Sequence, residues 1–483
     1  MMCDQLTESN FDTYKSPFSW RYGSEEMRSL FSEKTKRTKW RKIWYELASS
    51  QYEYGLITKS ELNDIKKFSS SNSVDIKRSL AIEKEIRHDL MAEIKTFANQ
   101  AKKGGGKIHL GATSMDIEDN ADMLIIREGM IIILEKTVDC LQLLSEKIQF
   151  HYKTVCMGWT HIQPAEPTTL GYRFSLYAQD LLLDIKNIEF ILENFALGKG
   201  IKGAVGTSAS YQRLLGKNTK SLENRIMKKL NLEAFLVSSQ TYPRKVDFLI
   251  LSALSSLAQS LHKFSIDFRI LQSPPFGEFK EPKKKRQVGS SAMPFKRNPM
   301  MSERISSLTR YLSSFLSVAH SNASNSILER TLDDSANRRI IIPESFLALD
   351  ECLMIYSKIL SGMEISSINI NKNLDTYGPF ALLEPLMMDL SKQGKNRQNI
   401  HEEFRKISLK AWNEIESGRP NPLFELLEKN KNLSKLNLDL KSLSDYSKYV
   451  GNAPERSLLL QKSISPVLKK YKNRTTRNSD PKY

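Results

Sequence analysis

The sequence predicts an all-α protein built around long helices, and three observations support this fold class. No proline occurs between Pro17 and Pro164, and none between Pro167 and Pro243. Gaps of this length suit helices better than turn-rich β-structure, because proline interrupts a helix interior. After Pro243, apolar residues recur every three or four positions over about seven turns, as on one face of a helix approaching ~40 Å. These residues are Val246, Ile250, Ala253, Leu257, Leu261, Phe264, Phe268 and Leu271.

Two earlier segments predict further long helices. The stretch 168–194 starts soon after Pro167, a common position for the beginning of a helix. The other segment has apolar residues at helical spacing, namely Leu134, Val138, Leu141, Leu144 and Ile148. Helices that are apolar along one face must pack against one another, either within the chain or between copies of it.

Breaks in this pattern divide the chain into three parts. Glycine- or proline-rich stretches occur at 102–114, 198–210 and 273–291, and a softer change follows Gly362. We therefore expect three domains: a mixed helical domain (1–112), a long-helix bundle (113–365) and a smaller helical domain with a basic tail (366–483).

Composition narrows the class of protein. Lys and Arg outnumber Asp and Glu by 72 to 55, a net charge of +17. That excess fits a nucleic acid, an anionic membrane, a polyanionic small substrate or simply a lysine-rich proteome. No apolar run approaches the ~20 residues of a membrane span, and we expect no membrane association. The four cysteines form no Cys-x-x-Cys pair and the N-terminus is polar, so we expect a cytoplasmic protein in a reducing compartment.

Three histidines lie in unusually polar surroundings: His88, His109 and His161. Any one of them is most often a hydrogen-bonded structural residue. Their spacing does not suit a metal site, and we expect no metal ion. His161 is the most suggestive of the three, because Thr160 and Gln163 flank it and could fix its tautomer.

Two other stretches could receive an anion. In "LERTLDDSANRRI", Arg330, Arg338 and Arg339 surround two aspartates and Ser335. This is either a surface salt-bridge cluster of little energetic value or a guanidinium clamp for phosphate or carboxylate. The residues "GATS" (111–114) could form a nest of backbone N–H groups for an oxyanion.

The stretch "GSSAMPFKRNP" (289–299) combines Ser290 and Ser291 with Lys296 and Arg297. Gly289 permits backbone angles that other residues resist, so a small mobile loop is expected. No Gly-x-Ser-x-Gly elbow occurs, which disfavours serine-hydrolase chemistry. Anion-binding groups, histidines and a hydroxyl loop together suggest proton abstraction beside a carboxylate, with a histidine protonating the leaving group.

"GSSAMPFKRNP" resembles the signature of the fumarase/aspartase/argininosuccinate lyase superfamily, in the form found in the adenylosuccinate lyase family. Further blocks resemble that family in the same order, from about residue 16 to about residue 405, and are most like its animal-type branch. They are "RYGSEEM", "RHDLMAEIKTF", "IHLGATS", "THIQPAEPTT", "SQTYPRKVD" and "ERTLDDSANRR".

The resemblance implies a β-elimination of fumarate from a purine nucleotide, without a metal or organic cofactor. It implies Ser290 as the base, His161 as the acid and Glu303 as the partner of His161. His88 would orient the substrate, while Lys296 and Asn298 would hold the succinyl carboxylates and stabilise the carbanion. The other implied substrate-binding residues are Arg21, Tyr22, Arg87, Asp89, Thr113, Ser114, Gln240, Arg304, Arg330, Ser335 and Arg339.

The resemblance also implies a homotetramer with a twenty-helix core, in which three chains share each active site. The chain departs from the family at Glu166, where glutamine is usual, and at Glu93 and Lys95, which are often histidine. Glu166 could raise the pKa of His161. The rival interpretations are a sister enzyme (argininosuccinate lyase or fumarase type) and a basic nucleic-acid-binding protein, which the ordered motifs disfavour.

Overall fold

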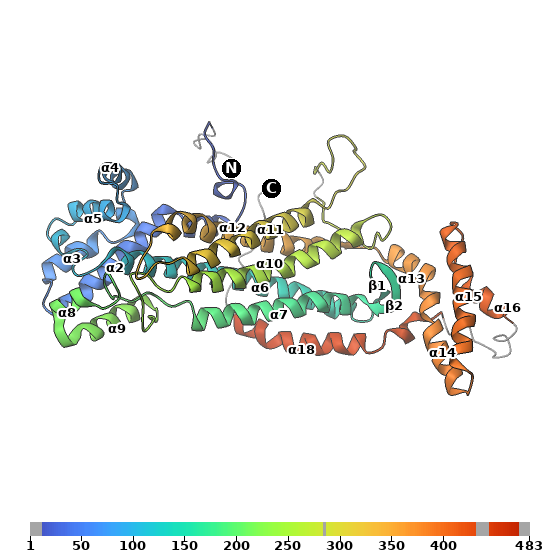
Figure 1. Ribbon diagram of the computed structural model, residues 1–483. Helices are drawn as coiled ribbons and strands as arrows, with labels where there is room; N and C mark the ends of the chain where they lie inside the picture. Colours follow the sequence, from blue (N-terminus) through green and yellow to red (C-terminus); the bar gives the residue numbers. More distant parts are fainter. Residues whose placement is uncertain (1–11, 284–285, 431–443, 473–483) are drawn as a thin grey trace.

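The computed structural model describes residues 12–283, 286–430 and 444–472 as an elongated, mostly helical molecule (Figure 1). Its centre is a bundle of five long helices: α6 (Ser114–His151), α7 (Leu170–Asn194), α10 (Lys245–Gln272), α11 (Met300–Ser324) and α12 (Asp333–Gly362). The predicted helical class is therefore confirmed, and short strands are the departure from it. None of the helices in the described ranges is both long and apolar enough to cross a membrane.

The predicted apolar stripes form the core of this bundle. Every stripe residue from Val246 to Leu271 lies on α10 and is buried, as are the five from Leu134 to Ile148 on α6. The helix predicted over 168–194 is α7, which begins at Leu170 after the side chain of Thr169 caps it. Helix α6 has 38 residues, so its axis spans roughly 57 Å at 1.5 Å per residue. This length separates the two ends of the molecule.

One end of the bundle carries a cluster of shorter helices (Figure 1). Helix α9 packs against α2, although it follows α7 in the sequence. The cluster consists of α1 (Glu25–Leu30), α2 (Glu33–Tyr52), α3 (Lys59–Lys67), α4 (Ile76–Ile86), α5 (Asp89–Gln100), α8 (Ala209–Leu215) and α9 (Thr219–Leu230). Short 3₁₀ turns also occur in the chain, at Pro17–Ser19, Ser71–Ser73, Gly105–Lys107, Gly216–Asn218 and Tyr446–Tyr449.

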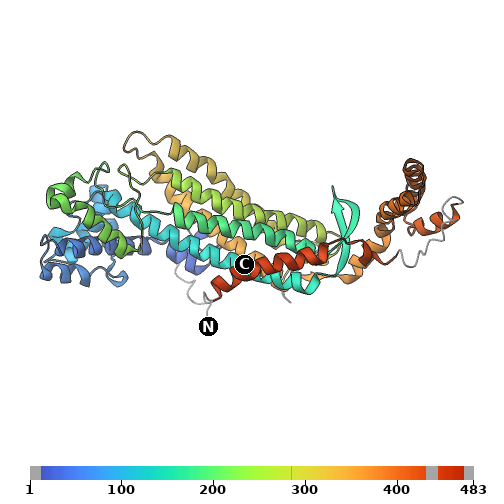
Figure 2. The ribbon, with the colours of Figure 1, turned by 90° about the horizontal axis from the view of Figure 1, so that it is seen from below.

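The other end carries short strands and the last helices of the chain. Strands β1 (Val155–Thr160) and β2 (Gln163–Thr169) form an antiparallel hairpin, while β3 (Phe279–Lys280) pairs with β4 (Glu364–Ile365). Helices α14, α15 and α16 share a separate small core, and α18 returns along α6 and α7 (Figure 2). These last helices are α13 (Ser367–Ala381), α14 (Leu383–Lys392), α15 (Arg397–Glu416), α16 (Leu423–Lys429) and α18 (Ala453–Tyr471).

The β1–β2 hairpin was not foreseen from the helical pattern. Pro164 and Pro167 cannot lie in a helix interior without breaking it, so no helix runs through this segment. Gly158 lies at an irregularity in the pairing, where a Cβ atom would come within 2.6 Å of the Glu166 carbonyl oxygen. A glycine is therefore required for the close approach of the two strands.

Candidate active site

The first group of candidate residues lies at the N-terminal end of α5. Arg87 ends α4 in a left-handed conformation (φ 57°), and His88 then caps α5, its Nδ1 accepting from the Met91 N–H at 3.5 Å. The Asp89 carboxylate accepts a hydrogen bond from Arg339 at 2.8 Å. The backbone turn thus brings Asp89 into contact with Arg339 of α12.

The expected oxyanion nest at "GATS" has a different role. The N–H of Thr113 donates to the Asp116 carboxylate at 3.0 Å, so it is engaged in capping α6. Asp116 is fully buried and also accepts from the Lys202 and Gly203 N–H groups. This carboxylate ties the start of α6, and with it Thr113 and Ser114, to the glycine-rich loop 198–206.

The three arginines of "LERTLDDSANRRI" play different parts. Arg338 is buried, and its guanidinium donates to Asp247 and to the Tyr242 hydroxyl, both at 2.7 Å. Arg339 is 57% exposed and donates to Asp89 at 2.8 Å. Neither sequence interpretation covers all three arginines: all of them line one cavity, but the Arg338 guanidinium is mainly engaged with interior residues.

That cavity, here called the arginine cavity, has a volume of about 130 Å³ and is lined by Arg330, Ser335, Arg338, Arg339, Glu118 and Lys36, among others. Arg330 donates to Asp334 at 2.8 Å. The Gln240 N–H donates to the Glu329 carbonyl at 3.1 Å, which brings Gln240 next to the arginine segment. Glu118 and Lys36 were not singled out from the sequence, although Glu118 lies four residues after Ser114 and so on the same helix face.

Arg21, Tyr22 and Arg304 form a second group. The Arg21 and Arg304 guanidinium carbons lie 5.8 and 5.7 Å from the centroid of the Tyr22 ring. Arg304 also donates to Glu351 at 3.3 Å. Two cations beside one phenol are a suitable receptor for phosphate or carboxylate oxygens.

The signature segment 289–299 closes on itself as a compact loop. The Asn298 side chain donates to the Gly289 carbonyl at 3.1 Å, and a Cβ atom on Gly289 would lie 2.5 Å from the Lys296 carbonyl oxygen. Gly289 is thus needed for the close approach of two backbone segments, rather than for a left-handed backbone angle.

Within this loop, Ser290 has a more suitable environment than Ser291 for a base. The Ser290 Oγ accepts from the N–H groups of Met293 at 3.1 Å and Ala292 at 3.4 Å. Hydrogen bonds donated to an oxygen favour its charged form, so this arrangement favours the alkoxide of Ser290. The sequence alone left the two serines equivalent.

His161 and Ile162 form the two-residue turn of the β1–β2 hairpin, which joins the paired residues Thr160 and Gln163. Both turn residues are left-handed, with φ values of 55° and 60°. Such a conformation costs of the order of 1–2 kcal/mol per non-glycine residue, and it is rare for a β-branched side chain. The turn projects the imidazole of His161 from the protein surface.

Ile162 lines a cavity of about 890 Å³ together with Gly289, Lys296, Asn298 and Glu303. The histidine hairpin and the signature loop therefore lie at the same end of one chain. A cavity of this size can hold a nucleotide-sized ligand.

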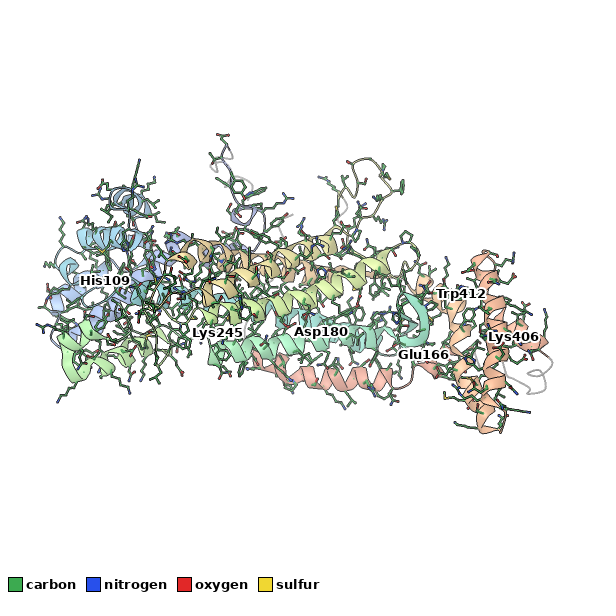
Figure 3. All side chains as sticks on the ribbon, in the orientation of Figure 1. His109, Glu166, Asp180, Lys245, Lys406 and Trp412 are labelled. Atoms are coloured by element: carbon green, nitrogen blue, oxygen red, sulfur yellow. The ribbon has the colours of Figure 1, made fainter. Side chains whose placement is uncertain are left out.

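The two groups of candidate residues lie far apart within one chain. His109, close to the beginning of α6, and Glu166, on the hairpin, mark opposite ends of the bundle (Figure 3). The length of α6 separates Ser114 from the hairpin by roughly 50 Å or more. One chain therefore does not bring His88, Thr113, Ser114 and Arg339 together with His161.

His109 has the features of a structural residue. Its Nδ1 accepts a hydrogen bond from the indole N–H of Trp44 at 3.0 Å, and burial lowers its pKa to about 4. The imidazole is therefore neutral at pH 7. It orients the loop that leads into Thr113 and Ser114.

Two of the sequence departures also have a structural context. Burial and a hydrogen bond with Glu384 of α14 raise the pKa of Glu166, so this side chain interacts with the C-terminal helices. Glu93 is buried between Arg41, which donates to it at 2.7 Å, and Arg37 at 3.7 Å. The carboxylate at position 93 neutralises buried arginines.

Comparisons with known proteins identify the family of this chain. A family described as "Lyase" matches residues 17–311, and one described as "Adenylosuccinate lyase C-terminus" matches residues 379–456. The adenylosuccinate lyase of Schistosoma mansoni is 40% identical, covering 97% of this chain and 99% of the relative. The adenylosuccinate lyase of Saccharomyces cerevisiae is 37% identical, covering 96% and 97% of the two chains.

Solved structures share the same fold at lower sequence identity. A fumarate lyase from Mesorhizobium sp. BNC1 superposes with a TM-score of 0.81 at 22% identity, covering 93% of this chain and 99% of the other. A 3-carboxy-cis,cis-muconate lactonizing enzyme from Pseudomonas putida gives the same TM-score, identity and coverage. At this identity the similarity extends to the fold alone.

Proposed function

Because this chain belongs to the adenylosuccinate lyase family of carbon–nitrogen lyases, we propose that it eliminates fumarate from adenylosuccinate to give AMP. We also assign to it the corresponding cleavage of the succinylated aminoimidazole carboxamide ribotide in purine nucleotide biosynthesis. Both substrates carry a phosphate and two carboxylates. The clustered arginines, and part of the net charge of +17, suit such polyanions.

In the proposed elimination, Ser290 removes a proton from the carbon beside a succinyl carboxylate. The electron pair left on that carbon is delocalised into the carboxylate, and the C–N bond then breaks to form fumarate. His161 donates a proton to the departing nitrogen, and Glu303 pairs with His161. The observation that carries this assignment is the pair of N–H groups aimed at the Ser290 Oγ, because they stabilise the alkoxide that a serine base requires.

The remaining candidate residues bind the substrate. Lys296 and Asn298 would contact the succinyl carboxylates, where negative charge develops in the transition state. The other contacts would come from the two arginine groups described above, including Arg21, Tyr22 and Arg304 in one, and His88, Asp89, Arg330, Ser335 and Arg339 in the other. Arg87, Thr113, Ser114 and Gln240 would complete the site.

A homotetramer is part of the proposal, with each active site formed by three chains. The distance between the two ends of one chain supports it, since Ser114 and His161 can meet only if they come from different copies. Exposed apolar side chains on α7 also support it. Leu176, Leu183 and Phe190 recur every seven residues and are 48–57% exposed. Five long helices from each of four chains would cover such faces in a twenty-helix core.

The direct test is to incubate the purified protein with adenylosuccinate and to measure the release of fumarate and AMP. Parallel assays with argininosuccinate and with malate distinguish the sister enzymes. A titration with DNA or RNA over a range of salt concentrations tests the nucleic-acid alternative. Turnover of adenylosuccinate alone supports the proposal, and turnover of another substrate without it would reject the proposal. A cytoplasmic location is also proposed, and fractionation of cells would test it.

A further inference from the structure

The arginine cavity contains an acidic side chain to which the family resemblance assigns no role. Glu118 lies on α6, one turn after Ser114, and lines the same cavity as Arg330, Ser335 and Arg339. A carboxylate in a site for a phosphate would repel the ligand. Its presence there therefore needs a physical explanation.

The arginines of the cavity donate their hydrogen bonds to carboxylates other than Glu118. Arg339 donates to Asp89, and Arg330 donates to Asp334, both at 2.8 Å. Arg338 is held by Asp247 at 2.7 Å and by Asp122 at 3.4 Å. Within the described ranges, Glu118 has no hydrogen bond or ion pair of its own.

Charged groups surround Glu118 on α6 itself and on the neighbouring elements α2, α5 and α12. Asp119 and Asp122 lie on α6 itself, and Asp89 lies at the start of α5. Helix α2 contributes Lys36 and Glu33, while the cations Arg330, Arg338 and Arg339 belong to or precede α12. Burial, followed by repulsion from Asp89 and Asp122, raises the pKa of Glu118 to about 8. The side chain is thus a neutral carboxylic acid over much of the physiological range.

We propose that Glu118 binds the nucleotide as a neutral acid, donating its hydroxyl proton in a hydrogen bond to a phosphate oxygen held by Arg330 and Arg339. This inference rests on the proposed function, which assigns Arg330 and Arg339 to the substrate-binding site, and it adds that the substrate phosphate is the group they hold. A protonated carboxyl has one O–H donor, and here that donor lacks a partner in the protein. A phosphate oxygen supplies the acceptor, and a hydrogen bond to a charged acceptor is the stronger kind.

Two consequences follow from the protonated state. Nucleotide binding weakens as pH rises past about 8, because the ionised form of Glu118 repels the phosphate instead of donating to it. Binding near pH 8 also takes up protons, since the complex contains the neutral acid whereas only part of the free protein does. The phosphate of AMP does not cause this change, because its second ionisation has a pKa of about 6 and is largely complete by pH 7.

The experiment measures AMP binding to the full-length protein by calorimetry between pH 7 and pH 9. For the wild type, we expect the Kd to rise about tenfold over this range, and binding at pH 8 to take up about half a proton. Proton uptake is obtained from the heats in two buffers of different ionisation enthalpy. Glu118→Gln keeps a neutral donor and should show a Kd within twofold at both pH values, with no proton uptake.

Two further variants complete the test. Glu118→Ala should bind AMP about tenfold more weakly than the wild type at pH 7, because it lacks the donor. The matched control is Glu33→Gln, which removes a second acid of the cavity whose side chain is 57% exposed, and it should retain the wild-type pH profile. Ribose 5-phosphate, a phosphate monoester that ionises in the same range as AMP, should reproduce the pH dependence of AMP if the contact is to the phosphate.

Each failure has a distinct outcome. If the Gln variant keeps the tenfold pH dependence and the proton uptake, Glu118 is not the donor and the inference is wrong. If AMP binds to Glu118→Ala as tightly as to the wild type, no contact exists. A wild-type protein that neither binds AMP nor releases fumarate would instead reject the proposed function itself.

Discussion

The two ends of the bundle are built differently. At the arginine cavity, the arginines are already paired with carboxylates of the same chain, as Arg339 is with Asp89 and Arg330 with Asp334. At the other end, His161 projects from a strained hairpin turn, and Lys296 lies exposed on a loop. The binding half of the proposed site is thus organised by folding, whereas the catalytic half is open to solvent.

This difference separates the residues that are positioned by the folding of one chain from those that depend on the assembly of several chains. A buried charge needs an oppositely charged partner as soon as the chain folds, because an unpaired buried charge is very costly. An exposed histidine or serine has no such requirement, so the groups that act with it can come from another chain. The predictions below test this division, starting with the catalytic end.

The largest effect is expected at Ser290. Ser290→Ala removes the oxygen toward which two N–H groups point, and turnover should fall by roughly 10³ to 10⁴, in the upper range for the loss of a general base. Ser291→Ala is the matched control, and turnover should change by less than about tenfold. Steady-state kinetics of fumarate release measures both, and AMP binding should be unchanged in each variant. The reverse ranking of the two serines would move the base by one residue.

Loss of an exposed arginine from the arginine cavity should weaken substrate binding rather than slow turnover. Arg339→Ala removes an exposed guanidinium and should raise KM about 10- to 100-fold, the value of one or two charge-assisted hydrogen bonds. The adjacent Arg338→Ala is the contrast, because Arg338 is buried on Asp247 and Tyr242. It should lower the free energy of unfolding by about 3–5 kcal/mol. If Arg339→Ala lowers stability and leaves KM unchanged, the residue is structural.

These two adjacent arginines also mark the limit of what the sequence predicts. Helical spacing identified the buried faces of α6 and α10, because packing of long helices depends on a pattern within each segment. The pattern cannot tell Arg338 from Arg339, since their burial depends on Asp247 and Asp89, which are distant in sequence. The family motifs identified Ser290, but its advantage over Ser291 depends on the fold of the loop. The hairpin was missed because its signal is two prolines and a glycine rather than a periodicity.

A smaller effect is expected from His109, at the end of the bundle that carries the arginine cavity. Its pKa is lowered by burial to about 4, below the value near 6.5 of an unfolded histidine. The neutral form is therefore the stable one, and stability is lost as pH falls below 6.5 toward 4. Between pH 7.5 and pH 5.5, this group alone should cost about 1.4 kcal/mol, a tenfold change in the unfolding equilibrium.

The comparison that isolates this contribution is wild type against His109→Gln, which cannot be protonated. The difference in the free energy of unfolding between the two proteins, measured by denaturant titration, should shrink by about 1.4 kcal/mol from pH 7.5 to pH 5.5. A difference that stays constant with pH would mean that His109 is not held neutral by the fold.

The last question is whether His161 and Ser290 act from one chain or from two. Ile162 and Lys296 line one cavity within a chain, which is compatible with a site on a single copy. The family resemblance implies instead that the hairpin and the signature loop of each active site come from different copies. His161→Ala should lower turnover by roughly 10² to 10⁴, so both single variants are suitable inactive parents.

Mixing the two inactive parents decides between these arrangements. His161→Ala and Ser290→Ala proteins are unfolded together in equal amounts, refolded, and checked for mixed tetramers by differently tagged chains. If the two residues come from different chains, each is intact at a given site with a probability of one half, so about one site in four is complete by symmetry counting. Activity should then return to about a quarter of the wild-type value, whereas each parent refolded alone stays inactive. If both residues act from one chain, every site lacks one of them in any mixture. Inactive mixed tetramers would therefore show that the acid and the base of each site come from the same copy. Each site would then combine the arginine cavity of one chain with the hairpin and signature loop of one other chain.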